Sequence, residues 1–369
     1  MGIHRLEVMA TDHLLRQRLA NQQLVNPPQH SVPEIVSWLG AVQSQEFHDA
    51  KWSVAQRTDG LTHDAFMQAF NEGMILRTHV LRPTWHFVAP ADIRWMLTLT
   101  APRIKAFMRT NDRKLGLDEA VFSRTNTLIE QTLGKAGRYL TRMELAGVLK
   151  QAGIRLEANA LAHILTRAEL EGIICSGAMQ GKHQTFALLD ERVPEAHQLP
   201  REEALAKLAT RYFASHGPAT VHDFSWWSGL TLTDARLSIE SIKSELASET
   251  IQGSTYWFVP ASIPDRLPTR ALLLPNFDEY VVGYADRTRL LEPTYAGELS
   301  GQGTILFYKT IVLTGQIVGT WKLVKEKARC RVERQPLRAL TDCEETQIAE
   351  TVERYLAFYE LPVDEPVTG

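Results

Sequence analysis

Two glutamines separated by one residue, Gln43 and Gln45, are the side chains whose spacing most directly suggests a site. They lie in the segment AVQSQEFHDAKWSVAQR (41–57), within a short polar break between two helix-like stretches. Residues two apart point to the same side of an extended chain but about 200° apart around a helix. Both amides can therefore serve one site only if the backbone around them is not helical.

Neutral amides restrict the chemistry that such a site can perform. A glutamine side chain both donates and accepts hydrogen bonds, so a pair of them can orient a water molecule or a sugar. An amide cannot act as a general base near neutral pH. We therefore expect Gln43 and Gln45 to serve a reaction whose leaving group departs easily.

Other catalytic patterns are absent from the sequence. The chain has no GxGxxG, GxxxxGK[ST], HExxH or GxSxG motif, and no CxxC or HxH pair. Its 12 histidines and 3 cysteines are scattered, without the spacing of metal ligands or of a disulfide framework. We expect no metal, no nucleotide cofactor and no other cofactor.

The strand-like segment MILRTHVLRPTWHFV (74–88) carries candidate nucleic-acid contacts. Alternation along a strand would place Thr84 and His86 on one face and the aromatic residues Trp85 and Phe87 on the other. A hairpin of this kind can contact a phosphate backbone. The alternative is a surface hairpin in which His86 is satisfied within the protein. The candidate contacts to DNA are Arg77, Arg82, Thr84 and His86.

A second polar segment, NFDEYVVGYADR (276–287), follows the apolar run LLLP. Its candidate DNA contacts are Asp278, Tyr280 and Arg287. An internal bridge between Asp286 and Arg287 would explain the presence of these two residues equally well. The run FSWW (224–227) is interpreted as protein core in preference to a platform on which bases stack.

Charge is distributed unevenly along this 369-residue chain, whose net charge is only −3. Residues 77–114 hold eight basic and two acidic side chains, and residues 336–369 hold two basic and eight acidic ones. One face could thus attract a polyanion, or both stretches could be solvated helix faces. The N-terminus lacks the apolar core of a signal peptide, and no run of 18 apolar residues follows. We expect a cytoplasmic monomer with no membrane segment.

The same order of elements is predicted three times: a helix, a capped helix, a third helix and a β-hairpin. The capping boxes are Ser31–Glu34, Thr141–Glu144 and Thr220–Asp223. The hairpins fall within residues 74–88, 172–189 and 250–259, with tips expected at Ser176-Gly177 and Gly253-Ser254. This order is typical of winged-helix modules, and the alternative is an irregular all-α array with incidental hairpins.

The remainder of the chain is rich in β-branched and aromatic residues. Strands within 270–284, 304–313 and 316–324, with a turn at Thr314-Gly315, predict a small antiparallel β-barrel, closed by a helix over 344–359. The fold class is therefore α+β. The expected domains are three winged-helix modules at 1–120, 121–198 and 199–262, with an additional helix near 47–57 in the first, and a barrel domain at 263–369.

Three segments together resemble one known family: residues 41–57, LRPTWHFVAPADIRWML (81–97) and LLLPNFDEYVVGYADR (272–287). They are similar to the winged-helix DNA-binding family that contains the AlkZ and YcaQ DNA glycosylases. This resemblance implies a C-shaped clamp on double-stranded DNA, and hydrolysis of N-glycosidic bonds to bulky alkylated purines or crosslinks. The AlkZ-like motif is Gln, an apolar residue and Gln, so Gln43 and Gln45 match it, whereas Ser44 departs from the apolar middle position.

The resemblance also implies roles for the two amides. A purine alkylated at N3 or N7 is cationic and leaves as a neutral base, so Gln43 and Gln45 would orient water and stabilise a cationic sugar. The motif places no lysine as a nucleophile, which favours a monofunctional enzyme. Glu46 could supply a carboxylate if its loop turned inward, although a solvated side chain is the simpler expectation. A non-catalytic winged-helix DNA-binding or regulatory protein is the competing hypothesis.

Overall fold

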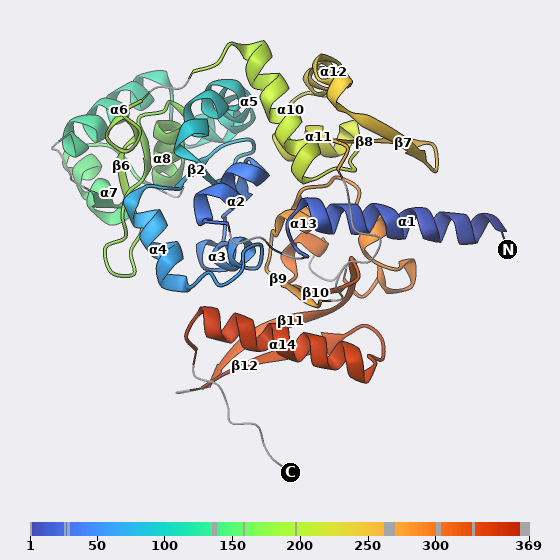
Figure 1. The fold of residues 1–369 in the computed structure, drawn as a ribbon. Coiled ribbons are helices and arrows are strands. Elements are labelled where there is room, and N and C mark those ends of the chain that lie inside the picture. Colours follow the sequence, from blue (N-terminus) through green and yellow to red (C-terminus); the bar gives the residue numbers. More distant parts are fainter. Residues whose placement is uncertain are drawn as a thin grey trace.

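The chain has an α+β structure, as the sequence predicted, with helices and small antiparallel sheets distributed along its whole length (Figure 1). No helix in the part of the chain described below is long and apolar enough to cross a membrane. The computed structural model describes residues 2–25, 27, 30–134, 139–157, 159–195, 198–261, 270–299, 304–326 and 329–361.

The first group of elements surrounds a three-stranded sheet with the order β1-β3-β2. Helix α3 is the additional helix that the sequence predicted. The short strand β1 was not predicted. It pairs with the edge of β3 that β2 leaves free, so β3 is the central strand of the sheet. The elements are α1 (Gly2–Asn21), α2 (Val32–Leu39), β1 (Val42–Gln43), α3 (Phe47–Ala55), α4 (His63–Glu72), β2 (Leu76–His79) and β3 (Trp85–Val88).

The second and third groups repeat the order of helix, capped helix, helix and hairpin. The second, with sheet order β4-β6-β5, contains α5 (Pro90–Lys114), α6 (Glu119–Leu133), β4 (Leu140–Thr141), α7 (Arg142–Gln151), α8 (Ala160–Leu170), β5 (Ile174–Ser176), β6 (Thr185–Leu188) and α9 (Leu189–Arg192). The third contains α10 (Arg201–Ser215), α11 (Val221–Ser228), α12 (Leu232–Ser241), η1 (Lys243–Glu245), β7 (Ala247–Ile251) and β8 (Ser254–Phe258).

Local signals in the sequence located these elements well. All three predicted capping boxes form, at the starts of α2, α7 and α11. The turn at Gly253 joins β7 to β8 as expected. The turn predicted at Ser176-Gly177 is wrong, because Ser176 ends β5 and the chain reverses farther on, where Gln180 and His183 form a bridge.

The C-terminal group is an open four-stranded sheet with the order β12-β11-β10-β9, so the closed barrel predicted from the sequence is not formed by the described strands. Helix α14 covers this sheet, and Thr351 Oγ1 donates to the Ala271 carbonyl beside β9 at 2.9 Å. The elements are β9 (Leu272–Leu274), α13 (Glu279–Val282), η2 (Thr288–Leu290), η3 (Pro293–Tyr295), η4 (Ile305–Phe307), β10 (Thr310–Leu313), β11 (Gln316–Glu326), β12 (Arg329–Pro336) and α14 (Asp342–Phe358).

Distant segments pack around the first group. The Trp52 indole on α3 donates to the Leu273 carbonyl of β9 at 2.8 Å. Helix α1 crosses to the third group, where Arg18 Nε donates to the Pro218 carbonyl at 2.9 Å. Figure 1 shows α2 and α3 between the second group and the C-terminal sheet. The segment holding the two glutamines therefore lies where several groups meet.

The predicted domain boundaries stay predictions. The first boundary, after residue 120, falls just inside α6, which begins at Glu119. The third boundary, after residue 262, lies outside the described residues.

Candidate active site

The backbone at the two glutamines is not helical, as their joint use requires: Gln43 lies in a strand and Gln45 in the bend that follows it. Gln43 ends the edge strand β1 opposite His86 of β3. The Ser44 amide donates to the Trp85 carbonyl at 2.7 Å, which makes Gln43 and His86 a pair without mutual backbone hydrogen bonds. Side chains of such a pair are close neighbours on one face of a sheet. Gln43 and His86 therefore lie side by side.

The side-chain amides of Gln43 and Gln45 both face the end of the loop that connects β2 to β3. Gln43 Oε1 accepts a hydrogen bond from Arg82 Nη2 at 2.8 Å. Gln45 Oε1 accepts a longer one, 3.4 Å, from the Trp85 amide. Gln43 is buried and Gln45 is half-buried. The two side chains thus approach the same short segment, Gln43 from the end of β1 and Gln45 from the bend that follows it.

Arg82 is fixed by the end of helix α11. Its Nη1 donates to the carbonyls of Trp226 and Trp227, at 3.4 and 3.1 Å. These carbonyls carry the negative end of the helix dipole and have no partner within the helix. Gly229, which ends α11 at φ +69°, lies so close that a Cβ there would come within 2.0 Å of the Leu81 carbonyl. Only glycine permits this contact, which presses the Arg82 turn against α11.

Glu279, buried at the start of α13, fastens the backbone of the motif from the other side. Its Oε1 accepts a hydrogen bond from the backbone N–H of Gln43, which points away from β3, at 2.7 Å. Its Oε2 accepts one from the Trp227 indole N–H at 2.9 Å. His216 Nε2 lies 3.4 Å from the same Oε2. Burial alone would raise the pKa of Glu279. The hydrogen bond and charge of His216, the charge of Arg82 and the hydrogen bond from the Gln43 backbone outweigh the effect of burial and lower this pKa to about 2. Glu279 is therefore an anion that holds Gln43 in place.

We expect Glu279→Gln to weaken both the fold and the site. A carboxamide cannot accept hydrogen bonds at both of its ends, so one buried donor among Gln43 and Trp227 loses its partner, at a cost of about 1–3 kcal/mol. Urea unfolding at pH 7 measures this loss. Because its pKa is depressed when folded, Glu279 stabilises the protein above pH 4.5 and loses this contribution as the pH falls toward 2.

The variant should accordingly show a flatter decline in stability over that acidic range than the parent protein. Glu203→Gln, an exposed position on α10, is the matched control and should leave both measurements unchanged. Equal stability of the Glu279→Gln variant and the parent at pH 7 would contradict the anchoring role.

Asp278, the residue before Glu279, holds helix α3 and does not face solvent. It is fully buried and forms an ion pair with Arg57, with Oδ1 2.7 Å from Nη2 and Oδ2 2.9 Å from Nη1. Ser53 Oγ donates to Oδ2 at 2.6 Å. This burial contradicts the predicted contact of Asp278 with DNA, since its carboxylate is occupied within the protein.

Tyr280 and Arg287 also have roles within the protein. Tyr280 is fully buried and its hydroxyl donates to the Gly315 carbonyl at 2.9 Å, which contradicts a direct contact with DNA. Arg287 is half-buried and donates to the Val281 and Ala285 carbonyls, while Asp286 accepts from Thr288 in place of the bridge that was the alternative to a binding role. The Arg287 guanidinium lies 5.0 Å from the ring of Trp226. Arg287 therefore stays a candidate contact at the protein surface.

The residues predicted to form a wing are mostly buried around the motif. His86 is inaccessible to solvent, and burial together with the charge of Arg82 lowers its pKa to about 3. The imidazole is therefore neutral, and a contact of His86 with DNA stays a prediction. Thr84 is half-buried in the turn, where its carbonyl accepts from His86 Nδ1. Arg77, 7% exposed, donates to the carbonyl of Ser44 and supports the motif.

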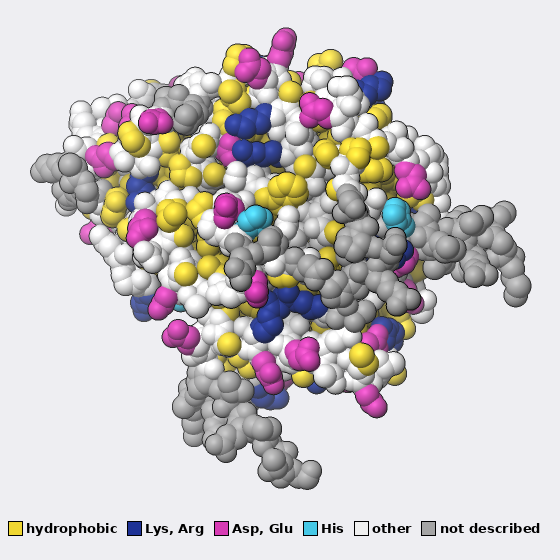
Figure 2. Space-filling model, viewed as in Figure 1, with side chains coloured by type: hydrophobic (Ala, Val, Ile, Leu, Met, Phe, Trp, Pro, Cys, Tyr) yellow, Lys and Arg dark blue, Asp and Glu magenta, His cyan; other side chains and the backbone are white. Residues whose placement is uncertain are grey.

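Two basic side chains of the 77–114 stretch form ion pairs with acidic residues of the second group. Arg94 and Lys105 pair with Asp190 and Glu171, at 2.6 and 3.1 Å. The face in Figure 2 mixes Lys and Arg side chains with Asp and Glu. The basic residues of α5 that are exposed and form no ion pair with any described residue are Arg103, Arg109, Arg113 and Lys114.

The structure also shows where Glu46 and the FSWW run lie, and whether acidic, His and Cys side chains gather. Glu46 is exposed and precedes α3 as its N-terminal flanking residue. Of the FSWW run, Phe224 and Trp227 are buried as expected, whereas Trp226 is 41% exposed. No three of the His, Cys, Asp and Glu side chains within the described ranges form a group that could hold a metal ion.

Comparison with known proteins identifies the family to which this chain belongs. Residues 36–358 match the family of AlkZ-like DNA glycosylases. The chain belongs to the AlkZ-like DNA glycosylase family. An interstrand DNA cross-link repair glycosylase of Streptomyces sahachiroi is 23% identical over 343 residues, covering 88% of this chain and 91% of the relative. The structure of S. sahachiroi DNA glycosylase AlkZ has the same fold, with a TM-score of 0.78, 20% identity and coverage of 96% and 98% of the two chains.

The three segments that carried the AlkZ-like resemblance meet in the structure. Glu279 and Asp278, from the third segment, hold Gln43 and Arg57 of the first, and Arg82, from the second, holds the amide of Gln43. The anchoring role of the two acids was not predicted from the sequence. The signal available was their position beside an apolar run, because a buried carboxylate requires a partner that the rest of the chain must supply.

Proposed function

We propose that this AlkZ-like protein is a DNA glycosylase that hydrolyses the N-glycosidic bond of cationic N3- or N7-alkylated purines in double-stranded DNA. The observation that carries the proposal is the anchored pair of glutamines. Gln43 is held by Arg82 through its side chain and by Glu279 through its backbone, and Gln45 turns toward the same segment. A fixed amide dipole orients a reactant without having to reorganise during the reaction.

In the proposed reaction the bond between the sugar C1′ and the base nitrogen breaks, and its electron pair leaves with the base. Because the alkylated purine is already cationic, it departs as a neutral molecule and needs no general acid. Water then adds to the sugar cation at C1′ and releases its proton to solvent, so the amides need not accept that proton. Unmodified purines, which would leave as anions, should be nearly inert.

We assign the positioning of water to the face shared by Gln43 and His86. Arg82 occupies one acceptor site of Gln43 Oε1 and leaves the second for water, since a carbonyl oxygen has two lone pairs. His86 Nδ1 donates to the Thr84 carbonyl, and the buried Nε2 has no partner among the described protein atoms. An uncharged Nε2 can accept a hydrogen bond from the same water. Glu279 partly offsets the positive charge that Arg82 would direct at a sugar cation.

Binding to DNA is assigned to the three helix and hairpin groups acting as winged-helix modules. The unpaired basic residues of α5 support this, since phosphate contacts by Arg and Lys supply most of the sequence-independent affinity of such proteins. The relative from S. sahachiroi acts on interstrand crosslinks, and we propose crosslinked purines as a second substrate class. With no lysine in the motif itself, a monofunctional reaction is expected, in which sodium borohydride traps no covalent protein–DNA adduct.

The deciding experiment is incubation of the purified protein with a duplex that contains a single N7-methylguanine. We expect abasic sites, detected by alkaline cleavage, to accumulate well above spontaneous depurination, and an unmodified duplex to stay intact. Absence of abasic sites on this duplex and on an N7-linked crosslink, together with sequence-selective binding, would instead indicate a non-catalytic DNA-binding protein.

A further inference from the structure

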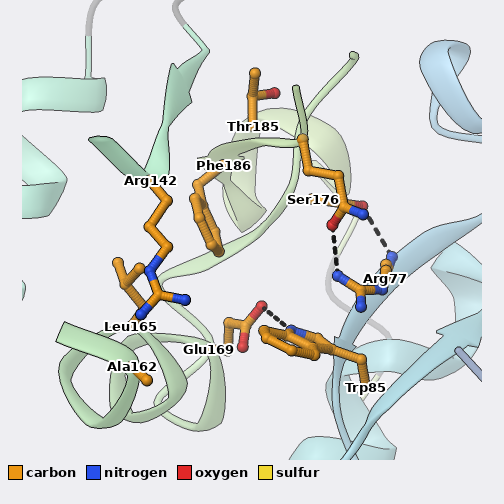
Figure 3. A pocket seen from close by; sticks show the side chains of 10 residues that line it. Arg77, Trp85, Arg142, Ala162, Leu165, Glu169, Ser176, Thr185 and Phe186 are labelled. Atoms are coloured by element: carbon orange, nitrogen blue, oxygen red, sulfur yellow. Dashed lines mark hydrogen bonds between the residues drawn. The ribbon is translucent and has the colours of Figure 1, made fainter. Parts of the chain in front are cut away.

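Two tryptophans lie near the glutamine motif, and they differ in what surrounds their rings. Figure 3 shows Trp85 directed at Glu169, to which its indole donates at 3.3 Å. Trp226, on α11, has no acidic partner among the described residues. Its indole donates to the Val282 carbonyl at 2.9 Å, and the side chain is 41% exposed. Trp226 is therefore a fixed aromatic surface that is open to solvent.

Two guanidinium groups lie beside the Trp226 ring. The guanidinium carbon of Arg287 is 5.0 Å from the ring centre, and that of Arg82 is 5.9 Å from it. The hydrogen bonds that these arginines make to described residues all go to neutral oxygen atoms. Burial and the charge of Arg82 lower the pKa of Arg287 to about 10, against the opposing effect of Asp223 and Asp286. Two like charges thus lie close together, and no described carboxylate is bonded to either.

Arg287 has hydrogen-bonding capacity left for an anion. A guanidinium carries five N–H groups. The described contacts of Arg287 use two of them, since Nε donates to the Val281 carbonyl at 2.9 Å and Nη1 to the Ala285 carbonyl at 3.1 Å. Nη2 is buried and has no partner among the described protein atoms. An unsatisfied donor on a charged group is costly, and a phosphate oxygen would satisfy it with a charge-assisted hydrogen bond.

Arg82 connects this surface to the glutamine motif. Its Nη1 donates to the Trp226 carbonyl at 3.4 Å, and its Nη2 donates to Gln43 Oε1 at 2.8 Å. We refer to Trp226, Arg82 and Arg287 together as the Trp226 platform. The platform lies one side chain away from the residue that we propose to act on the sugar.

The chemistry of the platform fits a nucleotide with an uncharged base. Bases stack on aromatic side chains, and arginines bind the phosphates of the backbone. A cationic alkylated base would be repelled by Arg82 and Arg287, whereas an undamaged base would not. The phosphate of such a nucleotide would also offset the positive charge that Arg82 directs at a sugar cation beside Gln43.

We propose that the Trp226 platform binds an undamaged nucleotide next to the lesion, with its base on Trp226 and its phosphate at Arg287 beside Arg82. The inference rests on the proposed glycosylase function and adds to it a subsite that holds the damaged strand beside Gln43. Stacking of one base on an aromatic side chain contributes roughly 5- to 150-fold in affinity.

The phosphate is tested with duplexes that contain N7-methylguanine and one uncharged methylphosphonate, on either the 5′ or the 3′ side of the lesion. For the intact protein, one of these two duplexes should show a kcat/KM lower by at least about tenfold, the loss expected for a hydrogen bond to a charged group. Arg287→Gln should lower kcat/KM on the ordinary lesion duplex by a similar factor and lose little more on that methylphosphonate duplex. A methylphosphonate far from the lesion is the control and should leave kcat/KM unchanged.

The stacked base is tested by Trp226→Ala, which should weaken binding of the lesion duplex by at least about fivefold. Trp226→Phe keeps an aromatic ring and should retain most of the affinity. Trp38→Ala is the matched control, since Trp38 on α2 is 38% exposed and its indole donates to the Asn21 carbonyl at 2.7 Å. This control should bind the duplex as the intact protein does. Thermal unfolding identifies the variants that are folded.

Normal kcat/KM of the intact protein on both methylphosphonate duplexes would overturn the proposal and leave the glycosylase function in place, as would unchanged affinity of a folded Trp226→Ala variant. Binding of AMP that Arg287→Gln abolishes, together with normal kcat/KM on both methylphosphonate duplexes, would assign the platform to a free nucleotide instead. Release of no base from any lesion duplex by the intact protein would refute the function itself, and the proposal with it.

Discussion

Replacing Gln45 by alanine should lower the rate at which N7-methylguanine is released from duplex DNA by about 100- to 1000-fold, the loss typical when one preorganised dipole is removed from a catalytic site. Among the described residues, the half-buried Gln45 side chain is bonded only to the Trp85 amide, by a long hydrogen bond, so its removal disturbs little of the fold. Single-turnover excision, with protein in excess over DNA, measures this step without product release.

Gln43→Ala should give a loss of similar size, and the double variant should lose little more than either single variant. Groups that act as one unit in a transition state show such non-additive effects. Gln68→Ala, at an exposed position on α4, is the control and should excise normally. Affinity for a duplex should be preserved in all three motif variants, because the phosphate contacts that we propose on α5 do not involve either glutamine. Normal excision by the double variant would refute the assigned chemistry.

Local features of this fold could be predicted from the sequence because their causes are local. Each capping box places a hydroxyl and a carboxylate three residues apart, and the helix start follows from that spacing alone. The turn at Thr314-Gly315 requires left-handed backbone, at φ 49° and 90°, and the glycine indicates it. The backbone at Gln43 and Gln45 is not helical, which meets the condition that the sequence set for both amides to serve one site.

The placement of His86 could not be predicted, because it depends on a strand that pairs from elsewhere. The alternation of residues 84–87 predicts an exposed His86 only if one face of this strand meets solvent. β1, only two residues long and without a β-rich pattern, pairs with the free edge of β3, and the faces of β3 are then covered. The same limit applies to Glu279, whose partner Gln43 is 236 residues away in the sequence.

The open C-terminal sheet could not be predicted either, because two folds share the same local sequence pattern. Strand-rich sequence is consistent with a closed barrel or with a sheet covered by a helix. Here α14 buries Ile348, Tyr355 and Phe358 against the sheet and α3, so a helix takes the place that further curling would fill. The helix predicted over 344–359 forms as α14, whereas the open sheet that it covers was not predicted.

The largest change in stability should follow from Asp278→Ala. This carboxylate and Arg57 are both inaccessible to solvent, and Ser53, Gln56 and the Tyr280 amide complete its hydrogen bonds. Removal of the carboxylate leaves the Arg57 guanidinium buried without its counterion. Breaking a buried ion pair in this way typically costs about 3–5 kcal/mol. Urea unfolding at pH 7, followed by circular dichroism, measures the loss in the free energy of unfolding.

A double variant separates the charge from the packing. If the loss arises from the unpaired Arg57, then Asp278→Leu combined with Arg57→Met should be more stable than Asp278→Ala alone, because neither variant side chain then carries a buried charge. Asp190→Ala is the control, since its carboxylate is 82% exposed in its pair with Arg94 and should contribute less than about 1 kcal/mol. Equal losses for Asp278→Ala and Asp190→Ala would show that the buried pair does not fasten α3 to the segment that carries Glu279.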